Sequence, residues 1–389
     1  MKKFFHVLTG ICTLLSAAVL WKIASVGRLL PNELYLTHEQ TVQLCGGEVD
    51  LCPMDGGCTA QQARLWGVIP LSEIPTREVD RPYLVPCGQP FGIKLLTEGA
   101  IVTGTAKTAR GVSPAEAAGV RPGDILLSVG GKAVSSAADI GRALSGNNGR
   151  EVLLELDRAG KRQTLSVRPD TDEDGDGSLG LLVRDSSAGI GTITWYDPAT
   201  GAFGGLGHGI CDTDTGVLLP LGSGQAVDVT ISGVRPAKAG SPGELAGIFS
   251  AHSRKGTLTA NLNCGVFGVL NAPPCQNEAL PVAFPQEVET GSAQILSTLS
   301  GSEPQLYEIE IERLDLSCPG NHRDMVIRVT DPRLLDEAGG IVQGMSGSPI
   351  LQNGRLVGAV THVFVNAPDM GYGILLQNML DGCAAGKAA

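Results

Sequence analysis

Glycine is the residue that most constrains what this chain can fold into. It supplies 53 of the 389 positions, stretches with helical periodicity are few, and aromatic residues make up only 4% of the chain. Because glycine permits tight turns and destabilises helix interiors, this pattern favours short strands joined by turns. We therefore expect a mainly β protein, long enough for about two or three compact domains that each bury a core.

The balance of charge excludes one class of function. Charged residues make up 18% of the chain, and the formal net charge is -11 at pH 7. A surface that binds nucleic acid needs clustered lysine and arginine side chains to neutralise phosphates. The sequence contains no such large cluster. We therefore expect no nucleic-acid partner.

The N-terminus carries an apolar run that is nearly long enough to span a bilayer. The run extends from Phe4 to Trp21 and follows Lys2 and Lys3. About 20 apolar residues cross the hydrocarbon core, and leading lysines keep this end in the cytoplasm. We expect residues 1–24 to form a signal anchor in the membrane, with the rest of the chain exported. A signal peptide cleaved near Ala18 is the alternative.

Four of the ten cysteines gather in the next part of the chain, which we expect to form a small β-rich region over residues 25–90. They are Cys45, Cys52, Cys58 and Cys87. One or two disulfides can staple such a region, although their pairing is not readable from sequence. The spacings contain no C-x-x-C pair, so we expect no zinc site, and no other metal or cofactor is expected.

Residues 91–170 show a regular succession of strand, turn and helix signals. Strand signals end at Gly-Gly and Ala-Gly turns, and a helix between them begins at a serine, Ser135 or Ser136, and stops at Gly146. Together with the segment 113–125, this order resembles a bacterial PDZ domain.

PDZ domains bind peptides by adding a strand to a sheet edge, and the amides of a glycine-containing loop hold the peptide terminus. The resemblance therefore implies a PDZ peptide ligand. The candidate loop consists of Phe91, Gly92, Ile93 and Lys94. The alternative is that Gly92 only permits a tight turn and that no peptide binds.

An acidic, glycine-rich run at residues 171–178 is expected to link the PDZ domain to the domain that follows. Its aspartates at 172, 174 and 176 alternate as calcium ligands would. However, the twelfth position counted from Asp172 is Val183, where an EF-hand loop needs a bidentate glutamate. We therefore expect no calcium site.

The strongest local signal is the segment 344–349, which reads GMSGSP and precedes an Asn-Gly hairpin and an apolar strand. A catalytic serine must lie on a tight turn where its hydroxyl faces a cleft and backbone N–H groups converge on the oxyanion. The segment resembles the nucleophile loop of chymotrypsin-family proteases, with Ser346 as nucleophile. A glycine-serine hairpin without a catalytic role is the alternative. The resemblance implies an oxyanion hole at the amides of Gly344 and Ser346, and a substrate-pairing strand at Val360, Thr361 and His362.

A serine nucleophile needs a base, and His208 is the best candidate among the six histidines. It lies in the glycine-flanked, apolar-led segment 203–210, whereas His6 is in the apolar run and His38 lies outside both main domains. The remaining histidines lack that context: His252, His322 and His362.

Further segments make the chain similar to the SpoIVB peptidase family of bacterial sporulation. They are residues 184–192, 206–215, 241–245, 330–335 and 339–346. The similarity extends from about Gly88 to Gly373 and includes the order of anchor, PDZ domain and protease. It implies a chymotrypsin-like double β-barrel serine peptidase domain over residues 179–383.

The resemblance implies a catalytic triad in which Ser346 is the nucleophile, His208 the general base and Asp331 the acid that orients the imidazole. In chymotrypsin-like proteases the acid usually lies in the same barrel as the histidine. Asp212 and Asp214, which are close to His208 in sequence, therefore remain alternatives. Gly340 stands where trypsin-like enzymes carry a charged specificity residue, so a strict preference for basic substrates is not expected.

The resemblance also implies a biological role. Members of the family are endopeptidases of the forespore intermembrane space that process themselves and cleave a membrane-bound inhibitor of an intramembrane protease, which releases a late sigma factor. The expected partners are protein substrates, including the chain itself and that inhibitor, and the membrane. The alternatives are a catalytically inactive PDZ-based adaptor and a thiol enzyme that uses Cys211.

Overall fold

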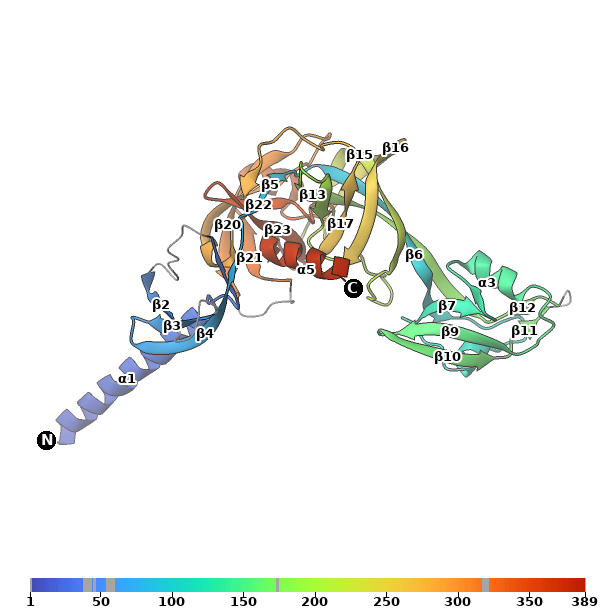
Figure 1. Cartoon of the computed structure of the whole chain (residues 1–389), viewed down its shortest axis with the longest axis horizontal. Coiled ribbons are helices and arrows are strands. Elements are labelled where there is room, and N and C mark those ends of the chain that lie inside the picture. Colours follow the sequence, from blue (N-terminus) through green and yellow to red (C-terminus); the bar gives the residue numbers. More distant parts are fainter. Residues whose placement is uncertain are drawn as a thin grey trace.

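The structure is a computed structural model that describes residues 2–37, 44, 47–53, 60–172, 175–316 and 322–388. Strands dominate it, as expected from the sequence. Along the chain an apolar helix and a small sheet precede a larger β assembly, and a PDZ domain projects from that assembly (Figure 1).

The first helix, α1 (Lys2–Gly27), is apolar and projects away from the rest of the molecule (Figure 1). The stretch Thr9–Gly27 has a mean hydropathy of 1.6, and only 6% of it is buried inside the molecule. The helix is therefore long and apolar enough to cross a membrane, as an anchor or as a signal sequence.

A four-stranded sheet follows α1. Its strands run in the order β1 (Leu34–Leu36), β4 (Ile69–Glu78), β3 (Ala60–Leu65) and β2 (Val49–Pro53). The core of this sheet includes Val26 at the end of α1, so the helix and the sheet pack together. Cys52 and Cys87 are free thiols. Cys45 and Cys58 lie outside the described residues, so the prediction of disulfides in this region stays a prediction.

Six strands form a first barrel that closes on itself. In spatial order they are β6 (Pro90–Thr105), β15 (Leu221–Arg235), β16 (Glu244–Leu262), β17 (Gly265–Leu270), β14 (Ala202–Gly205) and β13 (Leu181–Tyr196), which pairs again with β6. Phe91 and Phe203 pack edge to face in its core, with ring centroids 5.7 Å apart.

A second closed barrel contains the strands nearest the C-terminus. Their order is β19 (Gly291–Ser297), β20 (Gln305–Leu314), β21 (Met325–Val329), β24 (Ala367–Leu375), β23 (Arg355–Phe364) and β22 (Pro349–Gln352). A short helix, α4 (Pro332–Ala338), follows β21. Two barrels in series are the architecture expected for a chymotrypsin-like protease.

Short elements hold the two barrels together. Between them, β5 (Tyr83–Pro86) pairs with β18 (Leu280–Pro281), and the 3-10 turn η2 (Pro285–Glu287) follows. The C-terminal helix α5 (Leu376–Ala388) places Met379 in one apolar cluster with Phe267 of the first barrel and Ile374 of the second. This shared core fixes the relative position of the barrels.

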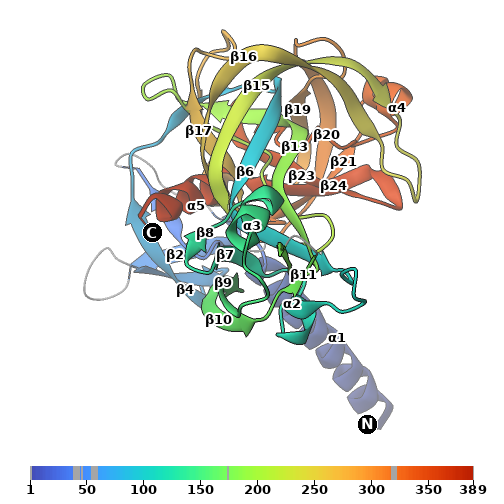
Figure 2. The same cartoon turned by 90° about the vertical axis from the view of Figure 1, so that its right-hand side faces the viewer.

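The PDZ domain is inserted into the first barrel rather than placed before it. It comprises α2 (Pro114–Ala117), β7 (Ile125–Val129), β8 (Lys132–Ala133), α3 (Ala137–Leu144), β9 (Val152–Arg158), β10 (Lys161–Val167), β11 (Asp170–Thr171) and β12 (Gly177–Ser178). The 16-residue strands β6 and β13 connect it to the barrel as an antiparallel ribbon. Figure 2 shows the PDZ domain in front of that ribbon.

The expected helix of the PDZ domain is present with its cap. Ser136 precedes α3, and its hydroxyl accepts a hydrogen bond from the N–H of Asp139 at 3.1 Å. Ile140 and Leu144 lie on its buried face and pack against Leu126 and Leu154. The helix therefore begins where the serine-cap rule placed it.

The proposed peptide-binding loop at Phe91, Gly92, Ile93 and Lys94 is wrong. These residues lie in β6 within the first barrel, where β13 pairs with one edge of the strand and β15 with the other. The side chains of Phe91 and Ile93 are buried in the barrel core. Both backbone edges are occupied, so no strand of a peptide ligand can add here.

The acidic run at 171–178 differs from a free linker. Residues 173 and 174 lie outside the described residues, but β11 pairs with β12 on either side of them. The carboxylate of Asp176 accepts hydrogen bonds from the N–H of Gly146 at 2.9 Å and from the hydroxyl of Ser145 at 3.0 Å. These contacts attach the run to the end of α3.

Candidate active site

The structure brings Ser346 and His208 to the same cleft, although they are far apart in the sequence. The cleft has a volume of about 470 Å³ and is lined by both residues together with Gly344, Thr361 and His362. His208 follows β14 of the first barrel, whereas Ser346 precedes β22 of the second. A cleft between two barrels therefore holds a hydroxyl and an imidazole.

The loop that carries Ser346 is shaped by two glycines. Gly344 has φ +99 and Gly347 has φ +95, a backbone region that other residues rarely adopt. A Cβ atom at Gly347 would lie 2.1 Å from the carbonyl oxygen of Thr192 and 2.5 Å from the nitrogen of Leu206. The turn therefore depends on the absence of a side chain at 347.

Strand β13 of the first barrel binds this loop through two threonines. The N–H of Thr192 donates to the carbonyl of Ser346 at 3.0 Å, and its hydroxyl donates to the carbonyl of Gly344 at 2.8 Å. The hydroxyl of Thr194 donates to the carbonyl of Gly347 at 2.8 Å. Sequence reasoning missed both threonines, because alternating threonines are ordinary in strands.

The amides expected to form the oxyanion hole remain available. Among the residues that the structure describes, no backbone carbonyl accepts a hydrogen bond from the N–H of Gly344 or of Ser346. The N–H groups of their neighbours Met345 and Gly347 are bonded, to Val342 and Val360 respectively. Among the described residues, the two amides that we expect to bind an oxyanion therefore lack a backbone acceptor.

The hydroxyl of Ser346 donates to the carbonyl of Thr361 at 2.6 Å. The Nδ1 atom of His208 lies 2.9 Å from the carbonyl oxygen of Gly209. That carbonyl can only accept, so Nδ1 carries the proton and Nε2 is the free basic nitrogen. Burial lowers the pKa of His208 below its ordinary value, which keeps the ring neutral near pH 7.

A second imidazole lies beside the first. The rings of His208 and His362 are tilted by 35°, with centroids 4.6 Å apart. His362 is exposed and lines the cleft. Desolvation, followed by the proximity of His208 and Arg323, lowers the pKa of His362 to about 4. His362 is therefore neutral at the pH where His208 would act as a base.

The residues of the expected substrate-pairing strand differ in the backbone hydrogen bonds that they make. The N–H of Val360 donates to Ser348 at 3.0 Å and its carbonyl accepts from Gly347 at 2.8 Å, so its backbone is used by the nucleophile loop. The pairing of β23 with β24 shifts register between Val360 and Val363. Thr361 and His362 lie in that interval and line the cleft.

The structure does not bring Asp331 to His208. Asp331 is the N-cap of α4, and its carboxylate accepts from the backbone N–H of Arg333 at 2.9 Å and from its guanidinium at 2.7 Å. The N–H of Glu308 donates to the same carboxylate at 3.2 Å. Hydrogen bonding with Arg333 lowers the pKa of Asp331 to about 2. Its role in a triad therefore stays a prediction.

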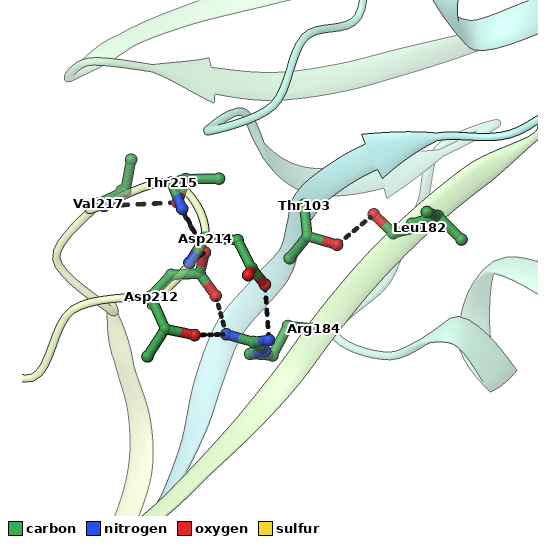
Figure 3. A network of polar contacts seen from close by, with 8 residues as sticks. Thr103, Leu182, Arg184, Asp212, Asp214, Thr215 and Val217 are labelled. Carbon is green, nitrogen blue, oxygen red and sulfur yellow. Dashed lines mark hydrogen bonds and ion pairs between the residues drawn. The ribbon is translucent and has the colours of Figure 1, made fainter.

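The alternative acids near His208 form a different network, shown in Figure 3. Arg184 of β13 pairs with the buried carboxylate of Asp212 and donates to that of Asp214 at 2.8 Å. Asp212 also accepts from the backbone N–H of Thr215 at 2.9 Å and from its hydroxyl at 2.8 Å. The carboxylate of Asp212 closes a turn, and both carboxylates contact Arg184 instead of the imidazole.

This network anchors the His208 loop, which we define as residues 206–219, to the ribbon that carries the PDZ domain. On the other side of the loop, Asn261 of β16 accepts from the N–H of Ile210 at 2.8 Å and donates to the carbonyls of Ile210 and Leu219 at 2.9 Å. The loop is thereby clamped between β13 and β16. Arg184 and Asn261 were missed by sequence reasoning, which has no signal for partners so distant in the chain.

The PDZ domain also contacts the His208 loop directly. Residues 121–125 and 157–160 of the PDZ domain line a shallow pocket together with Val217 and Leu218. A Cβ atom at Gly123 would lie 3.3 Å from the Cγ2 atom of Val217. The loop that carries the imidazole is therefore in contact with a neighbouring domain.

Comparisons with curated proteins give two partial relatives. A zinc metalloprotease candidate of Neisseria meningitidis is 39% identical over 67 residues, which is 17% of this chain and 15% of that protein. A zinc metalloprotease candidate of Lactococcus lactis is 32% identical over 111 residues, which is 28% of this chain and 23% of that protein. The chain thus spans less than a quarter of the length of either relative.

Among solved structures, the Rv3671c protease of Mycobacterium tuberculosis in its active form has a TM-score of 0.31 and 14% identity, covering 51% of this chain and 74% of that one. Its inactive form gives a TM-score of 0.30 and 15% identity, covering 50% and 83%. The PDZ domain of an SdrC-like protein from Listeria monocytogenes has a TM-score of 0.19 and 18% identity, covering 22% of this chain and 87% of that one.

Two family profiles match the chain. One describes a PDZ domain and matches residues 111–158, inside the insertion seen in the structure. The other describes the SpoIVB peptidase S55 and matches residues 175–380, more than half of the chain and nearly all of both barrels beyond β6. With its cleft between two barrels and its inserted PDZ domain, the chain belongs to the SpoIVB peptidase S55 family and is a serine peptidase.

Proposed function

We propose that this serine peptidase is a sporulation endopeptidase that cleaves itself and a membrane-bound inhibitor of an intramembrane protease, and thereby triggers release of a late sigma factor. The observation that carries its catalytic part is the convergence of Ser346 and His208 in one cleft. Membership of the SpoIVB family supports the biological part. The α1 helix supports an extracytoplasmic location at the forespore intermembrane space, with the chain anchored or released there after self-cleavage.

In the proposed mechanism the hydroxyl of Ser346 leaves the carbonyl of Thr361 and turns toward His208. The Nε2 atom of His208 takes the proton while Ser346 attacks the substrate carbonyl. The amides of Gly344 and Ser346 bind the oxyanion. His208 then gives its proton to the leaving amine, and a water molecule repeats the sequence to release the acyl group. No step requires a metal or an organic cofactor.

The mechanism also needs a group that orients the imidazole of His208. In the conformation described here, the carbonyl of Gly209 holds Nδ1 of His208. A triad with Asp331 requires the segment before α4 to move, because the carboxylate now pairs with Arg333. We propose that Asp331 replaces the carbonyl of Gly209 at Nδ1 in the active conformation, in the role that the family resemblance implies.

The expected partners follow from the domains. A peptidase with a PDZ domain acts on protein or peptide substrates. We propose that the PDZ domain binds a peptide segment of the substrate or of a sister chain, at a site other than the barrel strand β6. Cleavage near α1 of the same chain would release the two barrels from the membrane.

An inactive PDZ-based adaptor is the second candidate function. The hydrogen bond from Ser346 to Thr361 favours it, because a serine held by a carbonyl is not activated. The two functions differ in one property: a peptidase must be able to turn Ser346 toward His208.

Cleavage by the full-length chain in detergent tests the proposal. We expect the wild type to cut itself or an unstructured test peptide, and Ser346→Ala to lose about 10⁴-fold or more in kcat. Ser348→Ala is the matched control, because Ser348 is in the same loop but its buried hydroxyl bonds Ser297 at 3.0 Å. Equal cleavage by wild type and Ser346→Ala would refute the catalytic assignment and leave the adaptor.

A further inference from the structure

Two cysteine side chains approach each other at the first barrel, outside the lining of the catalytic cleft. Cys87 lies between β5 and β6 and is fully buried. Cys275 lies in the segment between β17 and β18 that connects the two barrels, and it is half-buried. Their Sγ atoms are 4.0 Å apart. Side-chain rotations that close about 2 Å would bring the two sulfurs to the bonding distance of a disulfide.

The two thiols differ in access. Cys275 lines a cavity of about 970 Å³ together with Gln89, Asp228 and Lys255, whereas Cys87 lies behind it. The cavity is large enough for a small peptide-like molecule. A molecule in the cavity therefore meets Cys275 first and reaches Cys87 only through Cys275.

The two thiols also differ in acidity. The contact between the two thiols lowers the pKa of Cys275 to about 6, and the N–H of Asn277 contributes. Burial raises the pKa of Cys87. Lys255 adds positive charge to the same cavity, although Asp228 pairs with it at 3.0 Å. An accessible thiolate with a buried thiol behind it is the arrangement required for stepwise thiol–disulfide exchange.

We propose that Cys275 and Cys87 form a redox site that reacts with oxidised low-molecular-weight thiols and ends as an intrachain disulfide. The thiolate of Cys275 attacks one sulfur of the disulfide R–S–S–R, forming a mixed disulfide and expelling RS⁻. Cys87 then transfers its proton to a departing thiolate while its sulfur attacks Sγ of Cys275, which expels the second RS⁻. Counted from the thiolate of Cys275 and the thiol of Cys87, the protein loses two electrons and one proton, and the small disulfide leaves as one thiol and one thiolate.

A disulfide at this site would link two distant segments of the fold. Cys87 and Cys275 are 188 positions apart, and the chain between them contains the PDZ domain and the whole first barrel. The N–H of Cys87 donates to the carbonyl of Thr194 at 3.1 Å, and the hydroxyl of Thr194 binds the nucleophile loop at Gly347. The disulfide would tie the start of this barrel to the segment that connects it to the second barrel.

The test uses the full-length reduced chain in detergent, exposed to oxidised glutathione, alkylated under denaturing conditions and digested for mass spectrometry. We expect a peptide cross-linked between Cys87 and Cys275, and a melting temperature about 5 °C or more above that of the reduced chain. Dithiothreitol should reverse both changes. Cys12→Ser, which removes an exposed thiol of α1, should leave the cross-link unchanged.

Single variants separate the two steps. Cys87→Ser should stop at a stable glutathione adduct on Cys275, and Cys275→Ser should leave Cys87 unmodified. The proposal is overturned if both thiols of the wild type stay free while the exposed Cys211 reacts, or if glutathione stays on Cys275 of the wild type without a cross-link. Both readouts are independent of peptidase activity, so they stand or fall separately from the proposed function.

Discussion

His208 has its basic nitrogen selected by the backbone and its charge suppressed by burial. The carbonyl of Gly209 fixes the proton on Nδ1, so the tautomer with a free Nε2 is present before any substrate binds. A general base acts only when it is neutral, and burial makes protonation of this ring harder. These two properties prepare His208 for the role of base.

The acid side of the pH–rate profile reports this effect. Because only neutral His208 is active and its pKa is lowered, we expect kcat/KM to rise with pH through an apparent pKa below 6.5. Activity should therefore persist at pH values where an ordinary histidine is already protonated. An acid limb centred above 6.5 would contradict the assigned environment.

Two variants of His362 serve as controls for that profile. His362→Phe retains a ring against His208 and should leave the acid limb in place. His362→Ala admits water to the ring of His208, so the limb should move up toward the ordinary histidine value. Equal profiles for the two variants would mean that His362 does not contribute to the desolvation of His208.

Asp331 is tested by comparing it with its ion-pair partner. We expect Asp331→Asn to lower kcat by about 10⁴-fold if the carboxylate orients His208 in the active conformation. Asparagine caps a helix as well as aspartate does, so the N-terminus of α4 should persist. Arg333→Gln breaks the same ion pair but retains the carboxylate, and its kcat should stay near that of the wild type. Equal kcat in the wild type and in both variants would mean that Asp331 only caps α4.

At the scale of the elements, the position of the His208 loop depends on partners outside its own sequence. Arg184 holds it through Asp212 and Asp214, and Asn261 holds its other side. Since misplacement of a base by about 1 Å costs much of its effect, these contacts position the imidazole without touching the substrate.

Removing the arginine tests this positioning role. We expect Arg184→Met to lower kcat by about tenfold or more with a smaller change in KM, and Arg184→Lys to restore part of the loss through one ion pair. Arg328→Met is the matched control, because Arg328 pairs with Glu312 and Asp369 on the second barrel and does not line the cleft. A fall in thermal stability with kcat unchanged would show that Arg184 only stabilises the fold.

At the scale of the whole molecule, the PDZ domain is an insertion whose removal should leave the barrels intact. Thr105 of β6 is paired with Leu181 of β13 where the two strands leave the domain. Replacing residues 106–180 by an Asn-Gly turn would therefore close a hairpin in the register already present. We expect this variant to fold and to cut an unstructured peptide, but to lose binding of PDZ ligands.

A truncation provides the contrast. Removing all residues before 171 also deletes β6, which pairs with both β13 and β15 in the first barrel. We expect that truncated chain to be unfolded or aggregated in circular dichroism and gel filtration. A folded, active truncation would contradict the insertion, and an unfolded 106–180 replacement would show that the barrel depends on PDZ contacts.

Sequence reasoning reached the parts of the molecule that depend on local chemistry. The serine cap of α3 and the glycine turn around Ser346 both rest on neighbouring residues. Sequence reasoning wrongly placed Phe91 in the PDZ domain. A strand that begins in one domain and ends in another has no local sequence signal at the boundary. Sequence reasoning also missed Thr192, Thr194 and Arg184, whose roles come from strand pairing across the chain.

The central claim is that His208 activates Ser346 across the cleft, and the rate of labelling by a serine-directed phosphonate measures it most directly. We expect the wild type to be labelled at Ser346 and His208→Ala to be labelled at least about 10²-fold more slowly, since a serine without its base is a weak nucleophile. Labelling of His208→Ala at the wild-type rate, or no labelling of a wild type that retains its fold, would contradict the account.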